Sequence, residues 1–191
     1  MQLKHWIVLV ASGLIAAAAS AQSYTLDPEH TYPHWSVNHF GLTTFQGKFT
    51  RTSGKVRLDP AGQTGNIEIT IDPASTLSGA ARLDKMMLGE DFFNVEKFPT
   101  AVFKSTALRW NGNQLASVDG QLAMVGQTRP VMLTVTSMRC TMHFRLKREV
   151  CGIEARTMLN REEWGLGSRF PVSVVGNDIA LYIQAEGVRD D

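Results

Sequence analysis

The sequence has no surplus of either charge and no long apolar run beyond its first residues, and both shortages exclude classes of protein. Nineteen Lys and Arg stand against 18 Asp and Glu, which gives a formal net charge of +1 at pH 7. A nucleic-acid-binding domain carries a strongly basic surface, so this balance argues against one. After residue 19, no apolar run approaches the roughly 20 residues of a membrane-spanning helix, so we expect no membrane span in the rest of the chain.

Familiar catalytic motifs are also missing. The chain has no G-x-S-x-G elbow, P-loop, H-E-x-x-H or C-x-x-C. His30, His34 and His39 suggest a metal site, but on one strand His34 and His39 would point to opposite faces. The adjacent Glu162 and Glu163 diverge, whereas acid–base catalysis needs converging groups, so we expect them to be solvated turn residues. The sequence therefore predicts neither a metal site nor a catalytic site.

The first 21 residues match a secretory signal peptide. Lys4 precedes an apolar run over residues 7–19, and Ala19-Ser20-Ala21 is a small-x-small cleavage site. We expect cleavage after Ala21. Because cleavage removes Lys4, 18 basic side chains then balance 18 acidic ones. From their length, we expect residues 22–191 to form one soluble domain with a sizeable core.

Only two cysteines are present, Cys140 and Cys151, on either side of a polar, basic segment. If residues 129–143 and 149–160 form a hairpin, the cysteines face each other across the strands. The Cα atoms of such a pair lie about 4.5–5.5 Å apart, within reach of a disulfide. Free thiols or a redox pair are the alternatives, although a redox motif usually has C-x-x-C spacing. We expect a structural disulfide, which suits an oxidising compartment.

Turn signals recur between runs of alternating apolar and polar residues. Asp59-Pro60-Ala61-Gly62, Asn111-Gly112 and Gly126-Gln127 each separate two such runs. This pattern predicts an all-β fold, an antiparallel barrel or sandwich of eight or nine strands.

One segment, residues 78–90, predicts a helix instead. Ser78 can cap it, good helix formers follow, and Gly89 suits its C-terminal end. Met86 in this segment and Phe92 just after it could close the mouth of a barrel. An ordinary helix packed over a sheet edge is the alternative.

An early stretch of the chain places a histidine on an apolar strand face. Trp35, Val37 and His39 share one face because side chains alternate with period two, and Phe45 and Phe49 continue the same parity. Such a face lines an apolar pocket, or it forms a core around one satisfied histidine. The strand pattern alone leaves both interpretations open.

Several motifs together resemble the YceI-like family. In chain order they are Tyr24-Thr25-Leu26-Asp27 with His30, Trp35-x-Val37-x-His39-x-Gly41, Phe45-x-Gly47-x-Phe49, Leu88-Gly89-x-x-Phe92-Phe93-x-Val95-x-x-Phe98-Pro99-x-x-x-Phe103, and Asn160-Arg161-x-x-Trp164-Gly165. The resemblance covers essentially the whole chain after residue 21. It implies a single lipocalin-like antiparallel barrel of about eight strands in the bacterial periplasm. It also implies an isoprenoid lipid or quinone in the bore, with no catalysis and no other cofactor.

We expect one set of mostly inward-facing residues to contact this ligand. They are Trp35, Val37, His39, Phe45, Phe49, Met86, Phe92, Phe103, Trp110, Asn160, Arg161 and Trp164. His39, Asn160 or Arg161 would orient a polar head, although Arg161 could equally hold an ion-pair partner or backbone carbonyls. The main alternative is a barrel filled by its own side chains that binds partners outside, and a third hypothesis is an enzyme with His39 as base. Exposed barrel edges are compatible with a homodimer.

Overall fold

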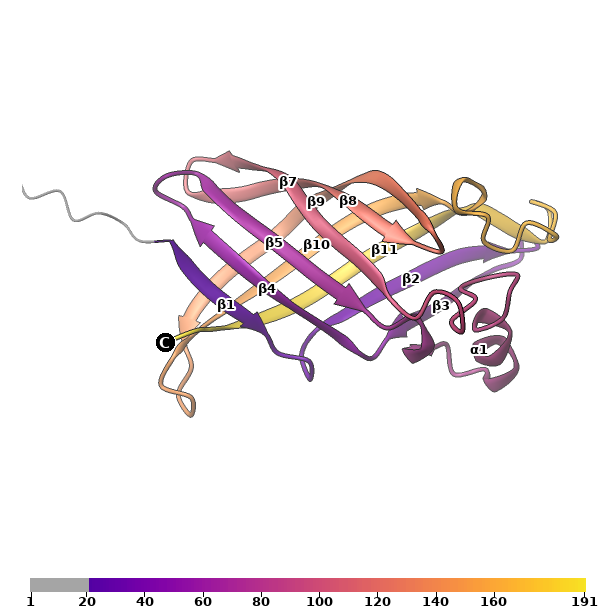
Figure 1. Cartoon of the computed structure of the whole chain (residues 1–191), viewed down its shortest axis with the longest axis horizontal. Coiled ribbons are helices and arrows are strands. Elements are labelled where there is room, and N and C mark those ends of the chain that lie inside the picture. Colours follow the sequence, from indigo (N-terminus) through magenta and orange to yellow (C-terminus); the bar gives the residue numbers. More distant parts are fainter. Residues whose placement is uncertain (1–20) are drawn as a thin grey trace, which may run out of the picture.

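The computed structural model describes residues 21–191, and the predicted signal peptide lies outside them apart from Ala21. The described residues form an antiparallel barrel with one short α-helix, α1 (Ala81–Met87), and two 3-10 turns, η1 (Pro73–Ser75) and η2 (Arg161–Trp164) (Figure 1). The strands are β1 (Gln22–Leu26), β2 (Tyr32–His39), β3 (Thr43–Phe49), β4 (Thr52–Asp59), β5 (Thr64–Ile71), β6 (Thr76–Leu77), β7 (Ala101–Asn111), β8 (Gln114–Met124), β9 (Gln127–Met142), β10 (Glu149–Asn160) and β11 (Val175–Arg189).

Eight of these strands close into a ring. Their order is β1-β4-β5-β7-β8-β9-β10-β11, and β11 pairs back onto β1. The long β11 pairs with β1 near its C-terminal end and with β2 over its earlier residues, so β1 and β2 are two parts of one wall. The predicted all-β antiparallel barrel of about eight strands is confirmed.

The chain leaves the β4–β5 ladder in the turn between β5 and β6. Asp72 caps η1 by accepting a hydrogen bond from the Ala74 backbone N–H at 2.8 Å, and Pro73 has no N–H to continue the ladder. After this turn, β6 pairs with β3, while β7 pairs with β5; β6 and β7 are not paired in the described sheet. Figure 1 shows α1 at this end of the barrel.

The helix predicted over residues 78–90 is real but shorter, and its expected cap is wrong. The N-cap is Ala80, which makes no side-chain capping bond. Ser78 instead donates from its backbone N and its Oγ to Asp84 Oδ1, at 2.7 and 2.6 Å. The reason is Gly79, whose φ of +85° turns the chain between Ser78 and the first helical residue.

Two predicted hairpins are confirmed by strand register. Asn111 pairs with Gln114 across the Asn-Gly turn between β7 and β8. Cys140 on β9 pairs with Cys151 on β10, and the two form the predicted disulfide. The hairpin of β9 and β10 is therefore crosslinked near its tip.

Removing this disulfide is expected to destabilise the protein moderately. In the chain-entropy model, closing so short a loop contributes about 3 kcal/mol. The double variant Cys140→Ala/Cys151→Ala should therefore lose about that much unfolding free energy in urea, at neutral pH and without reductant. An unchanged unfolding midpoint would show that the crosslink does not stabilise the fold.

The barrel interior is divided along its length into a packed part and a hollow part. One buried cluster is a continuous core built from Ile67, Phe103, Leu115, Val118, Leu122, Val131 and Trp164. A second cluster nearer α1 contains Trp35, Phe49, Met87 and Phe93. Met124, Val125 and Leu166 contact both clusters. The filled-barrel hypothesis therefore describes one part of the interior but not the part beneath α1.

Candidate ligand pocket

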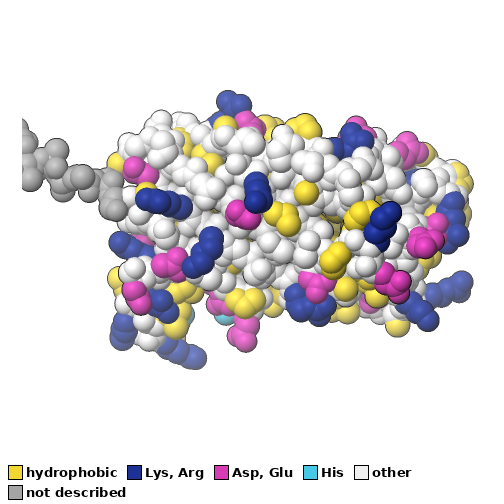
Figure 2. Space-filling view, in the orientation of Figure 1, with side chains coloured by type: hydrophobic (Ala, Val, Ile, Leu, Met, Phe, Trp, Pro, Cys, Tyr) yellow, Lys and Arg dark blue, Asp and Glu magenta, His cyan; other side chains and the backbone are white. Residues whose placement is uncertain are grey.

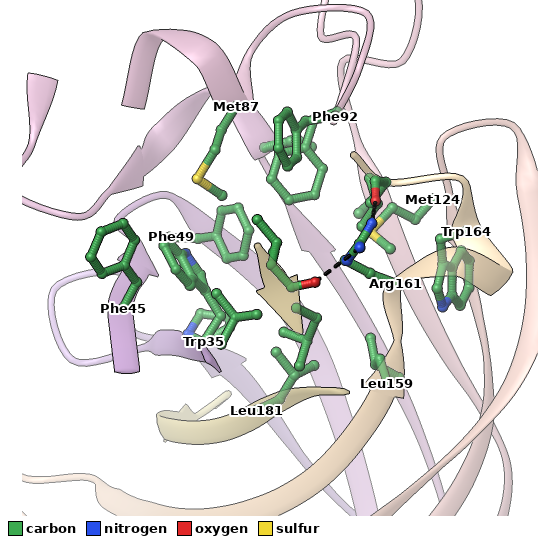
Figure 3. A pocket seen from close by; sticks show the side chains of 18 of the residues that line it. Trp35, Phe45, Phe49, Met87, Phe92, Met124, Leu159, Arg161, Trp164 and Leu181 are labelled. Atoms are coloured by element: carbon green, nitrogen blue, oxygen red, sulfur yellow. Dashed lines mark hydrogen bonds between the residues drawn. The ribbon is translucent and has the colours of Figure 1, made fainter. Parts of the chain in front are cut away.

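A cavity of about 210 Å³ lies in the barrel end that α1 covers. Its walls come mainly from β2, β3 and β11, with further side chains from β5, β7, β8 and β10. Its cover consists of α1 and of two segments, residues 88–95 and residues 165–174, which we together call the roof. The side chains that line it are apolar or aromatic apart from His39 and Arg161 (Figure 3). Trp164 lines the cavity and belongs to the packed core, so it marks the boundary between the two parts.

The wall formed by β2 and β3 has the predicted parity. Trp35 lies opposite Gly47, and Val37 lies opposite Phe45. A Cβ added at Gly47 would come within 2.6 Å of Trp35 Cε2, so the glycine allows the indole to lie along the wall. Trp35 is 6% exposed, and its Nε1 is buried without a hydrogen-bond partner among the described residues.

His39 lies at the mouth of the pocket among aromatic rings. Its imidazole stacks on Phe45 with centroids 4.1 Å apart and meets Phe40 edge-on at 4.7 Å. Within residues 21–191 the imidazole makes no hydrogen bond, so its ring nitrogens are available to a ligand.

Exposed apolar side chains surround this mouth. The hairpin between β2 and β3 presents Phe40, Leu42 and Phe45, which are 52%, 81% and 37% exposed. Met86 on α1 and Val172 in the roof are 37% and 52% exposed. The Phe40 N–H donates to the Val174 carbonyl at 2.9 Å, which ties the hairpin to the roof. The route into the cavity is therefore apolar from the surface inward.

Arg161 organises the roof rather than the ligand. It is 2% exposed, and its guanidinium donates to five backbone carbonyls. These are Gly176 O (3.1 Å), Leu166 O (3.0 Å), Gly167 O (2.8 Å), Phe170 O (2.8 Å) and Val175 O (3.0 Å). All five guanidinium N–H donors are therefore used. The expectation that Arg161 orients a ligand head is wrong, and the alternative of a backbone-carbonyl partner is confirmed.

The roof is closed by contacts between its two chain segments. The Gly167 N–H donates to Asp91 O at 2.5 Å, and Arg169 forms an ion pair with the Asp91 carboxylate. Gly167 has a φ of +61°, and a Cβ there would lie 2.9 Å from Phe92 Cε1, so the close approach requires glycine. The rings of Phe92 and Phe170 are 5.7 Å apart. Arg161 thus fixes residues 165–174, and this segment in turn holds residues 88–95 in place.

The structure brings most of the predicted ligand contacts together. Those that line the cavity are Trp35, Val37, His39, Phe45, Phe49, Met86, Phe92, Arg161 and Trp164. They come from segments more than a hundred residues apart, which the barrel gathers at one end. Their contact with a ligand remains a prediction.

Three predicted contacts lie elsewhere. Phe103 follows the cavity-lining Ala101 on the same face of β7 but packs one step deeper, in the filled core. Trp110, further along β7, packs against that core. Asn160 caps η2, where its Oδ1 accepts from Glu162 N at 3.0 Å. Strand parity identifies inward residues, but it does not say how far along the bore they lie.

Several lining residues were not predicted. Ile179 and Leu181 share one face of β11, and their period-two spacing was a usable signal. Phe170 and Val174 lie in the irregular part of the roof, where no periodicity marks inward positions.

Three further features of the described residues bear on the site. Residues 21–191 contain no group of three or more His, Cys, Asp or Glu side chains placed to hold a metal ion. Glu162 and Glu163 are exposed in η2, as predicted for solvated turn residues. No helix in this part of the chain is long and apolar enough to cross a membrane.

The fold and the pocket define a class of protein, the small closed antiparallel barrel with an apolar cavity at one end. A family model described as a YceI-like domain matches residues 24–187. A UPF0312 protein of Pseudomonas putida strain GB-1 is 32% identical over 183 residues, which covers 92% of this chain and 91% of that protein. The chain belongs to the YceI-like family.

Solved structures agree with this fold. BcnA of Burkholderia cenocepacia matches with a TM-score of 0.70 at 21% identity, covering 84% of this chain and 98% of that one. A polyisoprenoid binding domain from Saccharophagus degradans matches with a TM-score of 0.65 at 14% identity, covering 87% and 98%. At these identities the likeness shows the fold alone.

Proposed function

We propose that this protein is a periplasmic carrier that holds an isoprenoid lipid or quinone in the cavity beneath α1. The observation that carries the proposal is the cavity at this end of the barrel, whose lining is apolar apart from His39 and Arg161. The YceI-like family and the polyisoprenoid binding domain among the structural neighbours support the same ligand class.

Burial of the ligand's chain would supply most of the affinity. Each buried CH₂ group contributes about 0.8 kcal/mol, so burying about ten isoprene carbons supplies the roughly 8 kcal/mol that corresponds to micromolar affinity, before the entropy cost of association. A polar head needs few partners, and the site offers His39 at its mouth. A quinone carbonyl is an acceptor that an imidazole N–H could satisfy.

The surroundings of His39 favour binding over catalysis. Its ring contacts are Phe40 and Phe45, which are neither nucleophiles nor carboxylates. A histidine that acts as a general base is normally oriented by a third group and placed beside the proton it removes. The proposal therefore assigns His39 to head-group recognition.

Two observations support the periplasmic location. Cys140 and Cys151 form a disulfide, and such bonds persist in oxidising compartments such as the periplasm. Residues 1–21 match a secretory signal peptide in sequence, although nearly all of them lie outside the described residues.

The proposal is tested by titrating delipidated protein with farnesol and with a short-chain ubiquinone, using displacement of a fluorescent apolar probe. We expect saturable binding of one ligand per chain. The His39→Ala variant should retain farnesol binding, because the chain supplies the affinity, and should bind the quinone more weakly. Absence of saturable binding for every isoprenoid tested would contradict the carrier function and favour a barrel that binds partners on its outside.

A further inference from the structure

The β9–β10 hairpin ends in a tip that the pocket does not explain. We define the tip as residues 142–148, together with Arg139 at its base. In Figure 1 this hairpin projects from the barrel at the lower left, beside the C-terminus, whereas α1 and the roof lie at the opposite end. We propose that the tip docks this protein onto an anionic lipid surface.

The tip exposes apolar side chains that the fold does not use. Met142, Phe144 and Leu146 are 67%, 70% and 44% exposed. Phe144 stacks only on its neighbour His143, with centroids 5.1 Å apart, and on the guanidinium of Arg145 at 5.3 Å. Exposed apolar groups gathered on a projecting segment mark an interaction site.

The same tip concentrates positive charge. Arg139, Arg145, Lys147 and Arg148 are all exposed, and Figure 2 shows dark-blue and yellow side chains mixed on the projecting hairpin. The nearest carboxylate in sequence, Glu149, accepts a hydrogen bond from the Tyr24 hydroxyl at 2.7 Å and so faces the barrel. Arg148 lies 3.7 Å from the Asp191 carboxylate, so Arg139, Arg145 and Lys147 supply the local positive charge of the tip in a chain with almost no net charge.

Cations mixed with Phe, Leu and Met select the interface of an anionic bilayer. Apolar side chains enter the boundary between head groups and acyl chains, while Lys and Arg pair with anionic head groups. An acidic protein would match the charge but would leave the outward-pointing Phe144 and Leu146 without a defined pocket. Charge complementarity and the apolar side chains together therefore favour the lipid surface.

The tip is held in a defined conformation. The Cys140–Cys151 disulfide crosslinks the two strands at the base of the tip. Within the tip, the His143 N–H donates to Arg148 O at 2.8 Å and the Lys147 N–H donates to His143 O at 2.9 Å. A preorganised tip loses little conformational freedom on docking, which strengthens binding.

The test is sedimentation of the intact, disulfide-bonded protein with vesicles of phosphatidylcholine alone and of an equimolar mixture of phosphatidylcholine and phosphatidylglycerol. We expect binding to the mixed vesicles and not to the neutral ones. Binding should fall at 1 M salt, where the Debye length is about 3 Å. Arg145→Gln/Lys147→Gln should weaken binding about 25-fold, since each cation near the surface contributes about fivefold. Phe144→Ser should weaken it about tenfold.

A matched control is Arg57→Gln/Arg156→Gln, which removes the same charge from two exposed positions on the barrel wall. This variant should bind the mixed vesicles like the wild type. Failure of the wild type to bind mixed vesicles, or equal losses in the tip and wall variants, would overturn the proposal. Concentration-dependent dimerisation that the tip variants abolish, without vesicle binding, would assign the tip to a second copy instead.

Discussion

Replacing Arg161 with Met is expected to destabilise the protein by at least about 3 kcal/mol and to abolish ligand retention. The guanidinium donates to five carbonyls that converge from two turns of the chain between residues 166 and 176. Each buried acceptor left without a donor costs about 1–3 kcal/mol unless the loop opens to water. Whether the carbonyls stay buried without donors or the loop opens to water, residues 166–176 lose the contacts that order the roof.

The effect can be separated into stability and roof order. Urea unfolding measures the loss of free energy, and amide hydrogen exchange over residues 165–176 measures whether the roof opens locally. Arg161→Lys should recover little, because an ammonium has three donors and cannot match five carbonyls held in a fork. Arg109→Met is the control: Arg109 pairs with Asp119 on the surface, so its loss should cost less than about 1 kcal/mol.

Wild-type stability and exchange in Arg161→Met would contradict the account of the roof. An intermediate result, with normal global stability but rapid exchange confined to residues 165–176, would locate the effect in local unfolding. That variant should still lose its ligand, because the same segment covers the cavity.

Val37→Trp is expected to abolish isoprenoid uptake while the barrel still folds. Val37 lies opposite Phe45 on the cavity wall, and a larger indole would occupy much of the 210 Å³. Overfilling a well-packed site costs about 1–3 kcal/mol, but here the added ring has an empty cavity to enter. Probe displacement measures uptake, and circular dichroism and urea unfolding measure the fold.

The neighbouring position supplies a matched control. Ser36 is on the same strand with its side chain on the outer face, so Ser36→Trp adds the same ring outside the barrel. It should bind ligand like the wild type. If Val37→Trp also binds normally, the cavity is not the ligand site and the filled-barrel alternative regains support.

The local features of this fold were predictable from sequence because they depend on short-range rules. Alternation placed Trp35 and Val37 on one face, and the register confirms it. The Asn-Gly turn at residues 111–112 and the Cys140–Cys151 pairing followed from hairpin geometry. Each of these features can be predicted from residues that are close in sequence and from the geometry of a single turn.

Features that depend on long-range packing were not predictable in the same way. Phe103 and Trp110 share the inward parity of the pocket residues, but their depth along the bore is set by strands distant in sequence. The role of Arg161 depends on where residues 166–176 fold back. Ser78 failed as a cap because of a single backbone angle at Gly79.

Native mass spectrometry of protein produced with its N-terminal sequence and purified without added lipid tests the central claim most directly. The account predicts one bound molecule per chain, identified as an isoprenoid lipid or quinone on extraction, and absent from Val37→Trp. Protein that carries no ligand and also fails to take up added polyprenyl lipids would contradict it.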